Sequence, residues 1–166
     1  MTHDRRIVRR TTTLLACTIL LLLTSLSIAA ATTVTVTNTN DSGPGSFRQA
    51  LVDAGDGDTI VFNLTSCPCA IVMTSATFQT TKNLTIIGPG PDQLRIDGNG
   101  GNVSDPNRRK IFSTSGTVTV ENLTFANSFG ISGGGIVNSG NLTLRNVVVR
   151  NNIGSLTGAV GGIDNV

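Results

Sequence analysis

The stretch GGGIVNSGNLTLRNVVVRNN, residues 133–152, decides the fold. It holds two short apolar runs, at 142–144 and 147–149, whose spacing is not that of a helix. In the first run apolar residues alternate with threonine, as expected for a strand that buries one face. Glycine and asparagine fill the gaps, and both tolerate the left-handed backbone of tight turns. The stretch therefore predicts short strands joined by turns.

The same pattern occurs once before in the chain, at a constant separation. Leu123 and Val147 begin matching segments, and their separation is 147 − 123 = 24. Three further pairs share this separation: Val118 and Leu142, Phe112 and Ile136, and Asn127 and Asn151. The sequence GGI at 134–136 recurs at 161–163, an offset of 27, and a loop accommodates the difference. Such a repeat is typical of a solenoid.

Each period contains three predicted strands, one after the glycines and one at each apolar run. Equivalent strands of successive periods would pair in parallel. A single unit cannot bury its apolar face alone, so neighbouring coils must stack. The sequence therefore predicts an all-β parallel β-helix with three short strands and about 24 residues per coil.

Earlier segments fit the same architecture with longer connections. A polar, charged loop at 97–110 would leave the coil and return. The other predicted strands lie at 33–37, 59–62, 70–73, 84–87, 94–96 and 110–112.

One helix is predicted at 46–55, before the regular coils. Ser46 and Gln49 have the spacing of a capping box, and Gly55 would supply the C-terminal stop. One face of this helix is apolar, formed by Phe47, Ala50, Leu51 and Ala54. The helix would cover the open apolar end and unpaired edge of the first coil.

The segment 1–31 has the organisation of a secretory leader. A basic segment at 5–10 precedes an apolar segment at 14–28 and three alanines at 29–31. This order predicts a signal peptide cleaved after Ala31, and hence a secreted or cell-envelope protein. The alternative is an uncleaved membrane anchor, because the apolar segment is near the shortest spanning length.

Composition excludes some classes of partner. The chain has 166 residues, of which 13% are charged and 4% aromatic. Residues 32–166 carry eight basic and nine acidic side chains, a net charge of 8 − 9 = −1. The positive charge of the whole chain therefore comes from the leader, and no nucleic-acid-binding surface is expected.

Two of the three cysteines, Cys67 and Cys69, follow the leader and flank Pro68. Export makes a disulfide between them chemically possible. We expect two packed thiols instead, because a bridge between residues two apart closes a strained ring that proline stiffens further. A metal site is disfavoured, because the single histidine, His3, lies in the leader.

With these motifs in place, the chain resembles a known family over about residues 33–166. The segments at 35–62, 82–98, 117–128 and 133–152 resemble secreted bacterial right-handed parallel β-helix proteins of the pectin-lyase-like fold. The GGGI and asparagine repeats are also similar to those of polymorphic outer-membrane proteins. The resemblance implies an asparagine ladder at a turn, matched by Asn127 and Asn151. Members of the family typically have many more coils, so we expect either that the chain is truncated at its C-terminus or that its end pairs with something.

Asp53, Asp56 and Asp58 form the first candidate site. Calcium prefers such clustered carboxylates, but the spacing is not that of an EF-hand loop. A helix end followed by a glycine-rich turn is the preferred interpretation.

The charged segment 107–110, together with Asp97 and Asp105, forms the second candidate site. A polysaccharide lyase would need such acids and an Arg or Lys base. Because the group lies on a single insertion, it is interpreted as a surface loop.

Two other motifs give no site. Glu121 has no paired acid for glycoside hydrolysis, because Arg145 occupies the equivalent position of the next period. The glycines at 133–135 lack the lysine and following helix of a phosphate loop, and we expect them to let coils approach closely.

No catalytic, cofactor-binding or metal-binding residue is assigned from the sequence. We expect an exported, non-catalytic scaffold or adhesin-like surface protein, with a leader at 1–31, an N-terminal cap at 32–62 and coils at 63–166. Its stacked faces would bind glycans or surface proteins, and its uncapped last coil would associate end to end. A carbohydrate lyase or hydrolase remnant and a fragment of a longer surface protein are the alternatives. Convergence of three or more acids and bases on one sheet face would favour the enzyme.

Overall fold

The computed structural model describes residues 30–100, 109–131, 133–155 and 157–166. All of its elements belong to the compact unit formed by residues 31–166. The predicted leader otherwise lies outside the described residues. Within the described part, no helix combines the length and the apolar character that crossing a membrane requires.

The described elements are one short helix and a series of short strands. They are α2 (Phe47–Asp53), β1 (Thr33–Val36), β2 (Thr59–Phe62), β3 (Cys69–Val72), β4 (Phe78–Thr80), β5 (Leu84–Ile87), β6 (Leu94–Asp97), β7 (Phe112–Thr114), β8 (Thr117–Ala126), β9 (Phe129–Gly130), β10 (Ile136–Asn138), β11 (Asn141–Arg150), β12 (Ile153–Gly154) and β13 (Ile163–Asn165).

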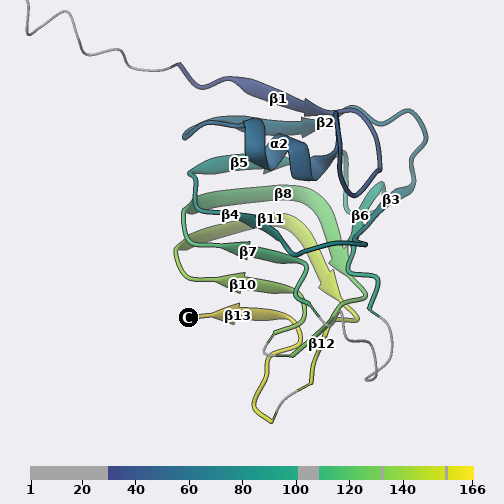
Figure 1. The fold of residues 1–166 in the computed structure, drawn as a ribbon, viewed down its shortest axis with the longest axis vertical. Coiled ribbons are helices and arrows are strands. Elements are labelled where there is room, and N and C mark those ends of the chain that lie inside the picture. The colour runs from purple at the N-terminus through teal and green to yellow at the C-terminus, as the bar shows by residue number, and fades with distance from the viewer. Residues whose placement is uncertain (1–29, 101–108, 132, 156) are drawn as a thin grey trace, which may run out of the picture. The chain divides into compact units, whose positions relative to one another are not determined.

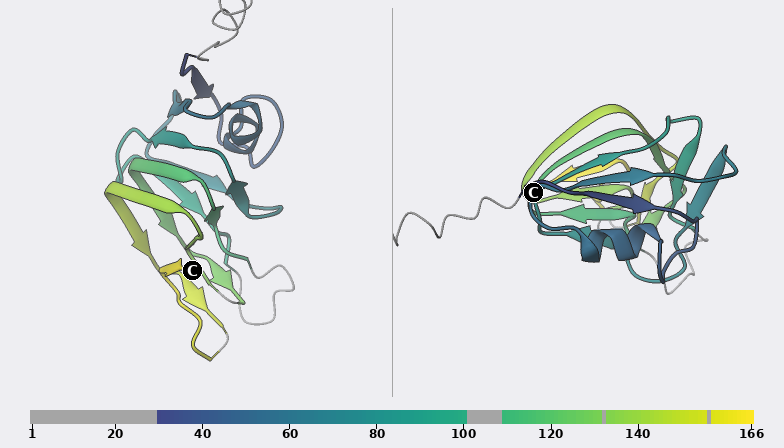
Figure 2. Two further views of the ribbon diagram at one scale, coloured as in Figure 1. Left: turned by 90° about the vertical axis from the view of Figure 1, so that its left-hand side faces the viewer. Right: turned by 90° about the horizontal axis from the view of Figure 1, so that it is seen from above.

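The strands wind into a β-solenoid of about five turns, in which equivalent strands stack in parallel (Figure 1). Face A contains β1, β2, β5 and the first halves of β8 and β11. Face B contains β3, β6 and the second halves of β8 and β11. Face C contains β4, β7, β10 and β13. Figure 2 shows these faces wrapped around a common interior.

The observed register confirms the predicted period. Strand β8 pairs with β11 at an offset of 24 along its length, so that Leu123 lies beside Val147. Strand β10 pairs with β13 at the predicted offset of 27, which places Ile136 beside Ile163. The all-β fold class with stacked parallel strands is therefore confirmed.

The two apolar runs of each period form one bent strand rather than two separate strands. Asn122 and Asn146 lie at the bend with φ values of 57° and 50°, so pairing continues through a single left-handed residue. Asn146 Nδ2 donates a hydrogen bond of 2.8 Å to Asn122 Oδ1. A hydrogen-bonded asparagine pair therefore lies at this bend, whereas Asn127, which also has positive φ like Asn151, donates to Asp97 instead.

The structure confirms the predicted N-cap of α2 at Ser46 and corrects the predicted C-terminal end of this helix. Ser46 Oγ accepts a 3.2 Å hydrogen bond from the backbone N–H of Gln49, as predicted. Gly55 does not supply a left-handed stop, because the helix ends at Asp53 and the next residue, Ala54, is already extended. Lys82 Nζ instead donates to the carbonyl oxygens of Leu51, Val52 and Ala54. A cation that satisfies the last carbonyls makes the left-handed residue unnecessary.

Side chains of alternating residues fill the interior. Four phenylalanines are fully buried and form the largest core side chains: Phe47, Phe78, Phe112 and Phe125. The predicted close approach at 133–135 is confirmed, because a Cβ on Gly135 would lie 2.4 Å from the carbonyl oxygen of Gly162. The strand predicted at 110–112 begins at Phe112 instead, and it stacks on β4, a strand that the sequence did not reveal.

Candidate binding groove

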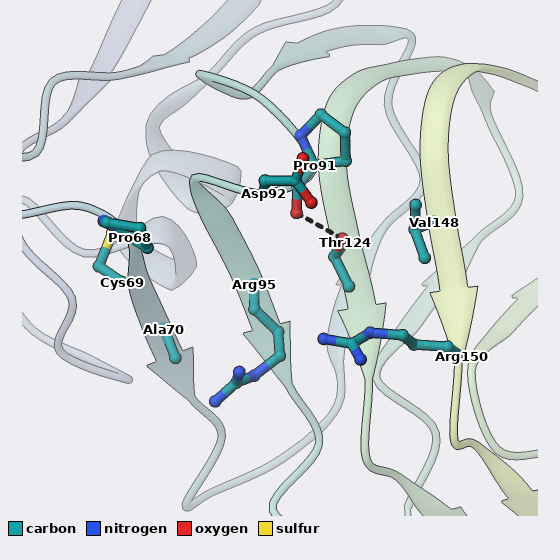
Figure 3. Close-up of a pocket in the computed structure, with 9 residues that line it drawn as sticks. All are labelled: Pro68, Cys69, Ala70, Pro91, Asp92, Arg95, Thr124, Val148 and Arg150. Atoms are coloured by element: carbon teal, nitrogen blue, oxygen red, sulfur yellow. Dashed lines mark hydrogen bonds between the residues drawn. The ribbon is translucent and has the colours of Figure 1, made fainter.

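A groove of about 520 Å³ runs across the outer surface of face B (Figure 3). Its wall combines apolar and charged side chains from four strands and two turns. They are Pro68, Cys69, Ala70, Pro91, Asp92, Arg95, Thr124, Val148 and Arg150.

The strand register brings the floor of this groove together. Ala70 pairs with Arg95, Arg95 with Thr124, and Thr124 with Val148, so the four residues form one row across face B. Their sequence neighbours, such as Leu94 and Leu123, point inward and are fully buried. Because side chains alternate along a strand, the row itself faces outward.

The turn before β6 forms the rim of the groove. Pro91 and Asp92 belong to this turn, and Thr124 Oγ1 donates a 2.7 Å hydrogen bond to the carbonyl oxygen of Pro91. This contact fixes the turn against β8 (Figure 3). The position of Asp92 beside the row is therefore set by the strands rather than by a free loop.

The charged groups of the groove differ in how they are held. Arg95 Nε donates to Asp97 Oδ2 at 2.8 Å, and Asn127 Nδ2 donates to the same oxygen at 2.8 Å. The other oxygen of Asp97 accepts from the backbone N–H of Asn99. Asp97 is thus a clamp whose two oxygens are both engaged.

Arg150 and Asp92 are the exposed charged groups of the groove. Neither forms an ion pair with any of the residues that the structure describes. Figure 3 shows the Arg150 side chain extending from β11 over β8, toward the side where Arg95 lies. The groove therefore offers guanidinium donors, one carboxylate acceptor and apolar surface from proline, alanine and valine.

The three clustered aspartates have separate partners. Asp53 accepts from Gln49 Nε2 and Asp56 from the backbone N–H of Asn83, each at 2.7 Å. Asp58 accepts from the backbone N–H groups of Thr32 and Gly55, also at 2.7 Å. These backbone hydrogen bonds, with that of Thr32 the larger, lower the pKa of Asp58. Among residues 30–100 and the other described segments, no three potential ligands gather as for a metal ion.

The structure describes only part of the charged insertion at 97–110. Asp105, Asn107 and Arg108 lie outside the described residues, whereas Arg109 forms an isolated antiparallel bridge with Phe129. Asp97, the first member of this group, belongs to face B beside the groove.

Glu121 and Arg145 lie side by side, as their equivalent positions in successive periods indicated. Arg145 Nη1 lies 2.9 Å from Glu121 Oε1 on the outside of face A. With the Arg145 side chain 69% exposed, this pair is a surface salt bridge.

The structure corrects the expectation of two free thiols. Cys67 and Cys69 form a disulfide, with their Cα atoms 4.3 Å apart. The chain turns at Pro68 directly before β3 begins at Cys69, which returns Cys67 to the side of its partner. Both cysteines are half-exposed.

Face A carries a second ordered polar surface. Five threonines stack in register along its outside: Thr33, Thr59, Thr85, Thr119 and Thr143. The row two residues further along is less uniform, because it passes from Val61 and Ile87 to Glu121 and Arg145. Face A therefore carries a hydroxyl ladder on its outer surface.

Sequence reasoning missed the residues of the groove. The positions of Ala70 and Arg95 differ by 95 − 70 = 25, and those of Arg95 and Thr124 by 124 − 95 = 29, rather than by 24. The charged insertion between β6 and β8 changes this spacing, so a fixed period does not reveal the row. The alternation of Leu94, Arg95 and Ile96 was the available signal that Arg95 faces outward.

The chain matches no protein-family model, and comparisons with curated proteins and with solved structures also find no match.

Proposed function

We propose that the chain is an exported, non-catalytic glycan-binding module of the right-handed, pectin-lyase-like kind, which acts as a scaffold or adhesin at the cell surface. The groove on face B is the observation that carries this proposal. Its volume of about 520 Å³ falls in the range of roughly 300–1,000 Å³ that is usual for small-molecule sites.

The groups in the groove suit a sugar ring. Arg95 and Arg150 would donate hydrogen bonds to its hydroxyl groups, Asp92 would accept them, and the carbons of Ala70 and Val148 would provide apolar contact. Neither tryptophan nor tyrosine occurs in the chain, so recognition would depend on hydrogen bonds rather than on stacking against these rings. A repeating glycan could extend beyond the groove along the solenoid.

Titration of the full chain against a panel of neutral and acidic oligosaccharides tests the proposal. Arg150→Ala and Asp92→Asn should each weaken binding roughly tenfold or more, because a hydrogen bond to a charged group contributes about 1.5–3 kcal/mol. Arg145→Ala is the matched control, since it removes an arginine from the same strand outside the groove. Equal loss in the control, or no binding to any glycan, would reject the proposal.

A lyase is the second candidate, because Arg95, Asp97 and Arg150 converge on one sheet face with Asp92 beside them. Both carboxylate oxygens of Asp97 already accept hydrogen bonds, so this side chain is held in place rather than free to take part in a reaction, which favours binding over catalysis. Incubation with polygalacturonate distinguishes the two. Formation of an unsaturated product that Arg150→Ala abolishes would favour the lyase, whereas binding without product would favour the module.

A further inference from the structure

The Cys67–Cys69 disulfide joins no separate elements of the fold. Its cysteines are two residues apart, so the closed loop is very short. Because the stabilisation by a disulfide grows with the length of the loop that it closes, this bond contributes little to holding the solenoid together.

The neighbouring backbone holds β3 in place without the disulfide. The N–H of Cys69 donates to the carbonyl oxygen of Gln93 at 2.9 Å, and that of Met73 donates to Asp97 at 2.9 Å. Between these contacts β3 pairs with β6 residue for residue. Strand β3 should therefore keep its position when the sulfur–sulfur bond is broken.

The surroundings of the two sulfur atoms also suit a reduced state. Cys69 Sγ lies 3.6 Å from the carbonyl oxygen of Gln93, within reach of a hydrogen bond that a thiol would donate. Cys69 packs against the core, whereas Cys67 precedes the strand. Both side chains are half-exposed, and Cys69 lines the groove on face B.

We propose that the Cys67–Cys69 disulfide is a thiol-exchange site for low-molecular-weight thiols that enter beside the groove. Exposed disulfides are the ones that exchange readily. Cys69, the leaving sulfur, lines the groove, whose volume is that of a small-molecule site, so the space beside the bond suits a small thiol better than a protein thiol. This activity does not depend on glycan binding.

The exchange proceeds in two balanced steps. The thiolate of the small molecule attacks Cys67 Sγ, a mixed disulfide forms, and the electron pair of the broken bond remains on Cys69 Sγ, which takes a proton from water. A second thiolate then attacks the sulfur of the small molecule in the mixed disulfide. The small disulfide leaves, and Cys67 is released as a thiolate. The protein is thus reduced by two electrons and two small thiols are oxidised.

Reduced glutathione is the probe for the full-length oxidised chain. After incubation with millimolar glutathione under native conditions, free thiols are trapped with a maleimide and located by peptide mass. We expect both Cys67 and Cys69 to be labelled, while the β-sheet circular dichroism and its thermal midpoint change little. Resistance of the disulfide until the protein unfolds, or collapse of the β-sheet signal on reduction, would overturn the proposal.

Two single variants test the order of attack independently of stability. Cys69→Ser should accumulate glutathione on Cys67 several-fold faster from oxidised glutathione than Cys67→Ser accumulates it on Cys69, because Cys69 packs against the core. Equal rates would contradict the assigned roles. Exchange with a small protein dithiol such as thioredoxin, in the absence of exchange with glutathione, would contradict the assignment to small thiols.

Discussion

Strands β8 and β11 share a length of ten residues and the same alternation, but they differ in burial. The inward side chains of β8 are fully or almost fully buried: Val118, Val120, Leu123 and Phe125. Their partners one coil later are half-exposed: Leu142, Leu144, Val147 and Val149. The two strands are equally apolar at these positions.

The difference arises from neighbours rather than from residue type. Strand β8 lies between β11 on one side and β5 and β6 on the other, whereas β11 pairs only with β8 among the described strands. Each coil therefore supplies part of the burial of the coil that stacks on it. This is the physical reason why a solenoid is stabilised by stacking rather than by any single repeat.

Truncation of an inward leucine on each strand gives the largest expected effect. Leu123→Ala should lower the free energy of unfolding by about 2–5 kcal/mol, because it opens a cavity in a filled core. Leu144→Ala makes the same chemical change on β11 and should cost less than about 2 kcal/mol, since the site is partly hydrated already. Urea unfolding followed by circular dichroism measures both, and equal costs would show that the coils do not depend on stacking.

The bend asparagines separate backbone strain from burial. Asn122 and Asn146 both have positive φ, which costs a residue such as alanine about 1–2 kcal/mol. Asn122→Ala and Asn146→Ala should therefore lower the free energy of unfolding by similar amounts, although the first bend lies on the buried strand β8 and the second on the half-exposed strand β11. Glycine at either position should restore most of the loss. A large cost at Asn122 alone would show that burial determines this effect as well.

The regularly repeating part of the chain, which contains both β8 and β11, could be predicted from the sequence. From Phe112 to Asn151 the chain repeats with a period of 24, so counting residues places Leu123 beside Val147 without coordinates. Helix α2 was also predictable, because Ser46 and Gln49 form a local capping interaction that involves no distant segment.

The groove and the disulfide could not be predicted, because they depend on irregular connections and on contacts between distant segments. Arg95 meets Thr124 across a connection of irregular length, and no local pattern fixes how many residues such an insertion contains. Lys82 caps α2 from a distant part of the chain, which local helix rules cannot reveal. Cys67 and Cys69 depend on how the chain turns before β3, which composition does not determine.

The ion pair between Asp41 and Arg48, near the first coil, provides a third test, in which stability changes only at acidic pH. Asp41 is held by Arg48 of α2 at 2.7 Å and by the hydroxyl groups of Ser75 and Thr74. Burial raises the pKa of Asp41, but the hydrogen bonds from Ser75 and Arg48 and the charge of Arg48 outweigh it and leave the pKa below its usual value.

The sign of the pH dependence follows from this direction. Because the folded-state pKa is lowered, the contribution to stability is complete above the unfolded value of about 3.9 and is lost as pH falls through the folded pKa. We expect the thermal midpoint to drop across this acid range, and Asp41→Asn to reduce the slope. Asp53→Asn, an exposed site at the end of α2, is the control. An identical slope in Asp41→Asn would show that other carboxylates control the acid transition.

The smallest effect concerns one hydroxyl group on the inside of face C. Thr80, Thr114 and Asn138 occupy equivalent positions on three successive strands. Thr80 Oγ1 accepts from the N–H of Lys82, and Asn138 bonds Asn165 and Gly140. Thr114 Oγ1 is buried and has no hydrogen-bond partner among the described residues.

Thr114→Val should therefore stabilise the protein by up to about 1 kcal/mol, because valine keeps the shape and removes an unpaired polar atom. The same substitution one strand earlier, Thr80→Val, should be destabilising, since it removes a formed hydrogen bond. Thermal melting of the two variants beside the unmodified chain measures this difference in sign. If both substitutions lower the melting temperature, the hydroxyl of Thr114 must gain a hydrogen bond in solution. Strand β7 would then tolerate a buried polar group as well as the strands at the ends of the stack do.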